Sequence, residues 1–239
     1  MKQEILPFTV RPVQDIDDLA KAIQARYMAY DRHLPTLAAK LKDIETTDTE
    51  EGVLVLLAES KLDGTALGTM RIQTNQFGPL AVEESVRLPS RFQHQKLAEA
   101  TRLGVENGKI GLLVKLALFK ACYQYCKRIE IDQLVISGRA PLDRLYQRWL
   151  FEDVFPNGGY IALSHVGNIP HRIMSADLHT SQARWESVKH PLLEFMVGTI
   201  HPDLEFDPTL IPSPRYTEAP WRAFSGATVP FPVHALLAH

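Results

Sequence analysis

A glutamate and an arginine lie three residues apart in the segment "LAEATRLGV" (residues 97–105), just before a turn that contains glycine. A carboxylate can accept a proton and a guanidinium can bind an anion, so Glu99 and Arg102 are candidate site residues. In a regular strand they point to opposite faces, because side chains alternate. A β-bulge between them would re-aim one of the two. Glu99 is therefore either a proton acceptor or the partner of Arg102 in a structural ion pair.

The turn "ENGKIG" (residues 106–111) joins this segment to a long apolar run. The N-terminus of a helix attracts phosphate through its free N–H groups and its dipole. A P-loop needs Ser or Thr after Gly-Lys, and here Ile110 follows. A dinucleotide fingerprint needs G-x-G-x-x-G, and the spacing of Gly104, Gly108 and Gly111 differs. Two interpretations remain: a phosphopantetheine arm beside the strand, or a tight turn without a ligand.

The bulk composition excludes several classes of protein. The chain has 239 residues, a net charge of −2 and a pI near 6.5, which give no electrostatic reason to expect nucleic acid or an anionic membrane as a partner. No apolar run reaches eighteen residues, so we expect no transmembrane segment. Residues 1–13 carry charges and prolines without an apolar core, so we expect no signal peptide. These features favour a cytoplasmic protein, and the oligomeric state is open.

The cysteines and histidines do not form a recognisable metal motif. Cys122 and Cys126 share one helix face in an apolar segment, which favours core packing and a reducing compartment. The spacings of His165, His171 and His179 fit no common ligand pattern. We therefore expect no metal.

The elements that would position these residues follow from apolar periodicity. Alternation predicts a strand at 8–13, and helical spacing after acidic residues predicts a helix at 15–33. Asp63-Gly64 between apolar runs predicts a hairpin. The further elements are a strand at 97–105, a buried helix at 108–128, a strand at 132–138, a helix at 141–151 and closing strands at 158–166 and 171–178.

This order predicts a mixed α/β sheet flanked by helices. Residues 1–198 would form one domain. Residues 199–239 are proline-rich and would form an irregular extension packed on the domain or on a partner.

Four segments in this order resemble the GNAT superfamily of N-acyltransferases, and more narrowly its long-chain N-acyl amino acid synthases and the related acyl-homoserine-lactone synthases. They are "ARYMAYDRHLP" (25–35), "ETTDTEEGVLVLLAE" (45–59), "GTALGTMRIQT" (64–74) and "EATRLGV" (99–105). The similarity covers residues 8–178. It implies a GNAT fold and transfer of a fatty acyl group from a thioester to the amine of an amino acid.

The resemblance also implies roles for individual residues. Glu99, Arg102 and Tyr146 would be catalytic, with Glu99 as the base and Tyr146 as proton donor to the leaving thiolate. The alternative for Tyr146 is a packed ring with its hydroxyl at the surface. The residues implied to bind the acceptor or to shape the carrier site are Arg26, Arg71, Glu45 and Asp48. The alternative for both arginines is a structural ion pair.

The turn that would bind the donor comprises Leu103, Val105, Gly108, Lys109, Ile110 and Gly111. Members that use acetyl-CoA carry Arg/Gln-x-x-Gly-x-Gly/Ala here. If Gly108 is the first glycine, Val105 stands at the basic position and Ile110 at the second glycine. This departure favours acyl carrier protein over CoA, because phosphopantetheine lacks the 3′-phospho-ADP that this loop grips. We expect no tightly bound cofactor, with acyl-carrier-protein phosphopantetheine or acyl-CoA as cosubstrate.

Two other functions are open. The first is an acyl-homoserine-lactone synthase, although those enzymes usually have a tryptophan in the first helix region and none precedes Trp149 here. The second is an inactive module that binds an acyl group or a carrier.

Overall fold

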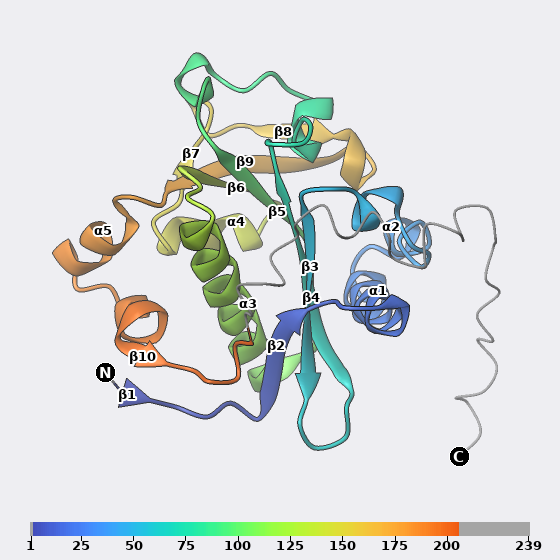
Figure 1. The fold of residues 1–239 in the computed structure, drawn as a ribbon. Helices are drawn as coiled ribbons and strands as arrows, with labels where there is room; N and C mark the ends of the chain where they lie inside the picture. Colours follow the sequence, from blue (N-terminus) through green and yellow to red (C-terminus); the bar gives the residue numbers. More distant parts are fainter. Residues whose placement is uncertain (1, 206–239) are drawn as a thin grey trace.

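The computed structural model describes residues 2–205 of the chain. Figure 1 shows a central sheet with α3 (Gly108–Arg128) on one face and α1 (Ile16–Asp31) and α2 (Pro35–Ala38) on the other. Two shorter helices, α4 (Leu142–Arg148) and α5 (Ser181–Ser187), lie on the α3 side. The GNAT-like order of strands and helices predicted from the sequence is present, whereas α2 and α5 were not predicted.

The strands are β1 (Lys2–Gln3), β2 (Phe8–Pro12), β3 (Val53–Ser60), β4 (Ala66–Thr74), β5 (Leu97–Val105), β6 (Gln133–Gly138), β7 (Glu152–Asp153), β8 (Tyr160–Leu163), β9 (Ile169–Asp177) and β10 (Thr199–Ile200). The larger sheet has the order β2-β3-β4-β5-β6-β9-β7, with β8 paired to β9. Within residues 2–205, its β5–β6 pair is parallel and its other neighbouring pairs are antiparallel.

The parallel pair is short. Leu97 to Ala100 of β5 pair with Gln133 to Ile136 of β6, and the two strands separate beyond that point. Beyond Ala100, the edge of β5 that faces β6 is therefore without a strand partner in the described part of the chain. Unpaired backbone groups at such an edge can bind an extended ligand.

A β-bulge lies next to this separation. Thr69 of β4 pairs with Gly104, and Arg71 pairs with Thr101, so Arg102 and Leu103 together oppose a single residue of β4. Arg102 has a φ of 53°, in the left-handed region. The extra residue re-aims the side chains on one side of the bulge relative to those on the other. The bulge considered from the sequence is therefore present.

Helix α1 packs directly on β5 at Gly104. A Cβ atom at this position would lie 3.0 Å from the Cα of Arg26 and 3.1 Å from the Cβ of Ala29. The absence of a side chain thus lets the helix backbone approach the strand. This contact sets the position of Arg26 relative to β5.

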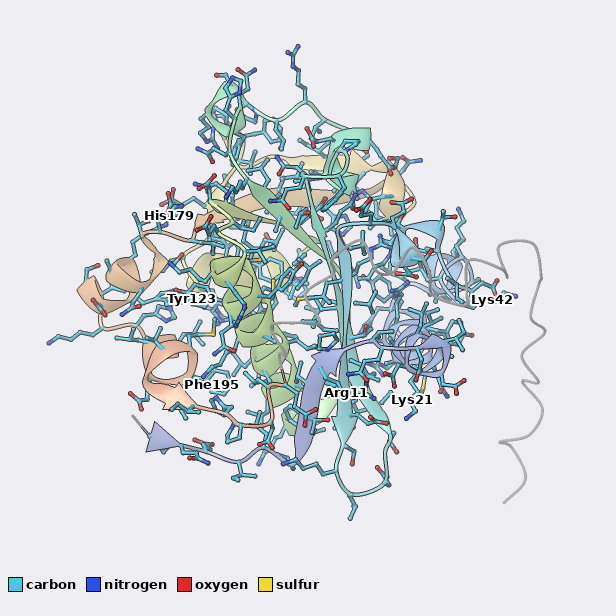
Figure 2. The ribbon with its side chains drawn as sticks, in the orientation of Figure 1. Arg11, Lys21, Lys42, Tyr123, His179 and Phe195 are labelled. Atoms are coloured by element: carbon cyan, nitrogen blue, oxygen red, sulfur yellow. The ribbon has the colours of Figure 1, made fainter. Side chains whose placement is uncertain are left out.

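Ion pairs hold the other end of α1 to the sheet. Arg11 of β2 binds Asp18 at the start of the helix, and Arg11 Nη2 lies 3.1 Å from Glu59 Oε2 of β3. Lys21 on the helix also pairs with Glu59. Figure 2 shows Arg11 and Lys21 in this region, beside α1.

The segment after α5 is packed on α3 through a buried lysine. Lys120 Nζ donates to the carbonyl oxygens of Phe195 (2.7 Å) and Thr199 and lies 2.8 Å from His201 Nδ1. Asp203 accepts a hydrogen bond from the Leu6 N–H at 2.6 Å. The first residues of the predicted extension, up to 205, therefore pack on the domain. The rest of that prediction, 206–239, lies outside the described residues.

The core explains the apolar periodicities. Residues of α3 pack with Leu56, Met70 and Ala98 of the sheet, and Cys122 and Cys126 are fully buried among them with free thiols. The prediction that both cysteines are core residues is confirmed. Of the helices in residues 2–205, none has the length and apolar character needed to cross a bilayer.

The close contact at Gly104 gives a stability prediction. We expect Gly104→Val to lower the free energy of unfolding by about 1–3 kcal/mol, because the new side chain pushes α1 away from β5. A Cβ at Gly78 would meet no atom within 4 Å, so Gly78→Val is the matched control and should change little. Urea denaturation measures both variants. Equal effects of the two substitutions would contradict this account of the packing.

Candidate active site

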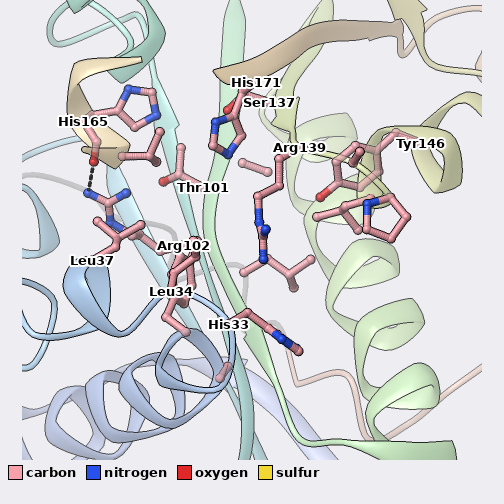
Figure 3. A pocket seen from close by; sticks show the side chains of 18 residues that line it. His33, Leu34, Leu37, Thr101, Arg102, Ser137, Arg139, Tyr146, His165 and His171 are labelled. Carbon is pink, nitrogen blue, oxygen red and sulfur yellow. Dashed lines mark hydrogen bonds between the residues drawn. The ribbon is translucent and has the colours of Figure 1, made fainter. Parts of the chain in front are cut away.

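A cavity of about 210 Å³ occupies the place where β5 and β6 separate. Its walls come from α1 and α2, from residues 100–103 of β5, from the end of β6 and the start of α4, and from the segment before β9. Figure 3 shows Arg102 and His165 on one side of this pocket and Arg139 and Tyr146 on the other. The separation of the two strands thus creates this cavity.

The pocket wall is basic. Among the side chains that line it are those of Arg102, Arg139, His33, His165 and His171, and the described lining contains no aspartate or glutamate. A cavity with low-dielectric walls strengthens the field of the two arginines. The pocket is therefore suited to an anionic ligand.

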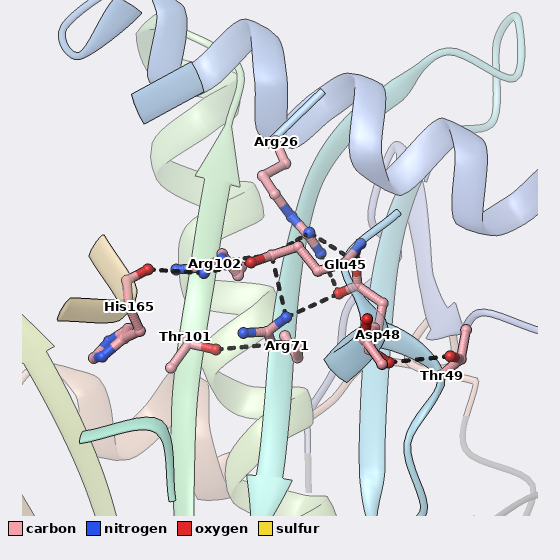
Figure 4. Close-up of polar contacts among 9 residues, drawn as sticks. Arg26, Glu45, Asp48, Thr49, Arg71, Thr101, Arg102 and His165 are labelled. Atoms are coloured by element: carbon pink, nitrogen blue, oxygen red, sulfur yellow. Dashed lines mark hydrogen bonds and ion pairs between the residues drawn. The ribbon is translucent and has the colours of Figure 1, made fainter. Parts of the chain in front are cut away.

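A buried network of charged side chains supports Arg102 from behind (Figure 4). Arg102 binds Glu45 through Nε (2.7 Å) and Nη2 (2.6 Å), and Arg71 Nη1 binds Glu45 and Asp48 at 3.2 Å each. Arg26 binds Asp48 through both terminal nitrogens (2.9 and 2.8 Å) and Glu45 through Nη1 (2.9 Å). Paired guanidinium–carboxylate contacts of this kind fix geometry as well as charge.

The network keeps its carboxylates ionised. Burial raises the pKa of Glu45 and of Asp48, but neighbouring groups outweigh it, so both pKa values lie below their ordinary range. Arg102, Arg71 and Arg26 lower the pKa of Glu45, and Arg26, Arg71 and the Glu45 N–H lower that of Asp48. Three guanidinium groups thus face two carboxylates. Arg102 Nη1 is buried and has no hydrogen-bond partner within residues 2–205.

The residues predicted from the sequence to bind the acceptor therefore lie close together, but they bind one another. Arg26, Arg71, Glu45 and Asp48 form the network and do not line the pocket described above. Arg102 is the member of the network that reaches the pocket wall, where its Nη2 also donates to the His165 carbonyl at 2.9 Å.

Glu99 is fully buried on β5, outside the pocket lining. Its Oε2 accepts a hydrogen bond from the Val82 N–H at 3.0 Å, and its Oε1 has no partner among the described residues. Burial raises the pKa of Glu99 to about 7, although the charges of Arg71 and Arg102 oppose this shift. A carboxyl with such a pKa can exchange a proton near neutral pH.

Tyr146 lies at the α4 side of the pocket. Its ring packs with Phe119, Trp149 and Phe151 at centroid distances of 5.7, 6.1 and 5.9 Å. Burial raises the pKa of the hydroxyl above its ordinary value. The hydroxyl points toward the pocket interior in Figure 3. The tyrosine is therefore held by its ring with its polar end facing the cavity.

Two histidines at the pocket were not selected from the sequence. Neither ring nitrogen of His165 has a hydrogen-bond partner in residues 2–205, and burial together with the charge of Arg102 lowers its pKa to about 4. Burial lowers the pKa of His171 as well, with Arg139 adding to the effect. Both imidazoles are thus neutral at pH 7. The sequence places both histidines in or next to the closing pair of strands. They were considered there only as metal ligands, and their spacing fits no ligand pattern.

Arg139 was also missed. It directly follows β6, and Arg102 lies near the end of β5, so both arginines come from the carboxyl ends of a parallel strand pair. Ligands bind at such ends where strands diverge. That rule could have identified Arg139 from the sequence.

The predicted donor turn lies where β5 leads into α3. Gly108 begins the helix with a φ of 79°, and a Cβ at Gly111 would clash with the Glu106 carbonyl oxygen. Asn107, the N-cap residue, makes no side-chain capping bond. Free N–H groups at the start of the helix are therefore available to a phosphate.

The other residues of this turn divide between two environments. Leu103 lines the pocket, whereas Val105 and Ile110 pack against the core and Lys109 is exposed. Arg32 of the α1 C-terminus donates to the Val105 carbonyl at 2.6 Å, which places a second cation near the turn.

The sequence matches no family model and no curated protein. Among solved structures, the fold is similar to that of FeeM, an N-acyl amino acid synthase from uncultured soil microbes. This similarity covers 79% of the chain and 97% of FeeM, with a TM-score of 0.60 and 16% sequence identity.

The fold is also similar to those of two further proteins. One is BjaI, a CoA-dependent acyl-homoserine lactone synthase, with 84% of this chain and 96% of that chain covered, a TM-score of 0.52 and 16% identity. The other is TofI, with 72% and 92% covered, a TM-score of 0.52 and 12% identity. The chain therefore has the GNAT fold, a mixed sheet flanked by helices, and the predicted fold class is confirmed.

The raised pKa of Glu99 gives a pH prediction. The carboxyl is neutral in the folded state up to about pH 7. Its contribution to stability is therefore complete below pH ~4.5, its unfolded pKa, and is lost as the pH rises through about 7. We expect Glu99→Gln to be more stable than the parent at pH 8, by up to about 3 kcal/mol, and similar to it at pH 4.

Urea denaturation at a series of pH values measures this difference. Glu51→Gln changes an exposed glutamate and is the control, which should follow the parent curve. Parallel curves for Glu99→Gln and the parent across pH 4–8 would show that folding does not shift the pKa of Glu99.

Proposed function

We propose that this protein is an N-acyltransferase that moves a fatty acyl group from a thioester to the amino group of an amino acid. The observation that carries the proposal is the buried, unpartnered Nη1 of Arg102 at a basic pocket between diverging strands of a GNAT fold. The fold similarity to an N-acyl amino acid synthase supports the same reaction class.

The donor arm would lie along the free edge of β5. Beyond Ala100 this edge faces the gap between β5 and β6, and the amides of an extended pantetheine can pair with it as a strand would. The phosphate would then reach the start of α3, with Lys109 and Arg32 nearby. Val105 and Ile110 at the turn favour a carrier-protein donor over CoA, so an acyl carrier protein is the proposed partner.

The acceptor would bind through its carboxylate. Arg102 Nη1 can donate to one carboxylate oxygen, while Glu45 and the His165 carbonyl hold the rest of the guanidinium in place. Arg26, Arg71 and Asp48 act through Glu45, because they fix its orientation without lining the pocket. They are positioning residues in this scheme.

The chemistry needs three events. The amine loses a proton and attacks the thioester carbon, a C–N bond forms, and the C–S bond breaks as the thiolate takes up a proton. The amine proton would pass to the neutral His165 at the pocket wall, or through a water molecule to Glu99 of β5. Tyr146 would protonate the thiolate, and backbone N–H groups at the bulge would stabilise the oxyanion.

The direct test incubates purified protein with acyl-carrier-protein and CoA thioesters and a panel of amino acids that includes S-adenosylmethionine, whose sulfonium group can leave on lactone formation, with mass spectrometry of the products. We expect an N-acyl amino acid. An alkali-labile lactone instead would identify an acyl-homoserine-lactone synthase, and thioester binding without any product would identify a binding module.

The role of Tyr146 gives a kinetic prediction. Tyr146→Phe keeps the ring in its aromatic cluster and removes only the hydroxyl, so we expect kcat to fall by about 10²–10⁴ with the fold intact. Tyr27→Phe removes a hydroxyl from α1 outside the pocket and is the control, with parental kcat. Parental kcat for Tyr146→Phe would remove the tyrosine from the mechanism.

A further inference from the structure

The pocket presents two guanidinium groups on opposite walls. Arg102 comes from β5, and Arg139 follows the end of β6. Figure 3 shows the Arg139 side chain extending into the pocket across the gap between the two strands. The described lining holds no carboxylate. Arg102 is paired with Glu45 behind the pocket wall, whereas the Arg139 side chain has no ion-pair partner among residues 2–205.

The two arginines differ in how much of their hydrogen-bonding capacity is used. Arg102 is bound by Glu45 and by the His165 carbonyl, so Nη1 alone is available. Arg139 is half-buried, and its side chain makes no hydrogen bond or ion pair within residues 2–205, although its backbone carbonyl accepts from the Leu142 and Asp143 N–H groups. A partly desolvated guanidinium without a partner is unfavourable, and an anion that binds there relieves this cost.

The pocket histidines do not share this charge. Arg102 contributes to the lowered pKa of His165, and Arg139 contributes to that of His171, so both imidazoles stay neutral at pH 7. The positive charge of the wall therefore comes from the two arginines. A ligand with a single carboxylate would pair one of them and leave the other unpaired.

We propose that the acceptor is an acidic amino acid, with its α-carboxylate on Arg102 and its side-chain carboxylate on Arg139. This inference rests on the proposed function and names the substrate class for the same pocket. A cavity of about 210 Å³ is smaller than a typical drug-sized site, which fits a compact, doubly charged head group.

A donor phosphate is a less suitable partner for Arg139. The N-terminal turn of α3, residues 108–111, does not contribute to the pocket lining, and Arg32 and Lys109 lie at that turn instead. Arg139 stands at the start of α4, across the pocket from Arg102. The second anionic group is thus assigned to the acceptor.

The test compares acceptors that differ only in side-chain charge: aspartate against asparagine, and glutamate against glutamine, each at saturating acyl thioester. Because a charge-assisted hydrogen bond is stronger than a neutral one, we expect the preferred acidic amino acid to have a kcat/KM about 10- to 100-fold above that of its amide. Arg139→Gln should reduce this ratio to near one, and Arg139→Lys should retain part of it. Arg144→Gln alters an exposed arginine of α4 and should keep the parental ratio.

Three results would overturn the inference. The parent could use amides as well as acids, or Arg139→Gln could leave the acid-to-amide ratio of kcat/KM unchanged. The third is that Arg139→Gln lowers kcat/KM equally for acids and amides and raises the KM for the thioester. The first two leave the proposed acyl transfer intact. If no amino acid is acylated, the proposed function fails separately. Calorimetric titration of aspartate and asparagine into the parent and Arg139→Gln then decides whether Arg139 selects the second carboxylate.

Discussion

The short parallel contact between β5 and β6 is the constraint on which the rest of the site depends. Four residues of each strand pair, and the strands then separate. The separation opens the cavity, frees one edge of β5, and brings Arg102 and Arg139 to facing walls. The bulge in β5 at Arg102 adds the residue that turns this side chain toward Glu45. Strand pairing would otherwise have filled the space with backbone hydrogen bonds.

The charged network behind the pocket has a positioning role. Burying three guanidinium groups and two carboxylates carries a desolvation cost that the ion pairs only partly offset, so such a network is weak evidence for stability. Its geometry instead fixes Arg102, which is held on Nε and Nη2 and presents Nη1. The network therefore has one more guanidinium than carboxylates.

Much of the fold was predictable because its elements have strong local signals. The alternating and apolar segments at 97–105 and 108–128 correspond residue for residue to β5 and α3, and Asp63-Gly64 lies in the β3–β4 hairpin as expected. Helix α5 was missed, because its residues, which follow the closing strands, carry no clear apolar period. The candidate site was predictable where it lies on those strong elements. Arg102 and Tyr146, selected from the sequence, line the pocket, whereas Glu99 is buried outside its lining. His165 and Arg139 also line the pocket and were not selected.

The sequence by itself determined the order of elements, the GNAT resemblance and the residue types on β5, since these depend on local periodicity and composition. Only the tertiary structure decided which charged side chains are paired with one another and which have no partner among residues 2–205. Glu45 and Asp48 lie far along the chain from Arg102 or Arg71, and their pairing follows from the packing of α1 and the preceding segment on the sheet. Whether an arginine is a structural partner or a ligand-binding group depends on the atoms around it, and those atoms come from distant parts of the chain.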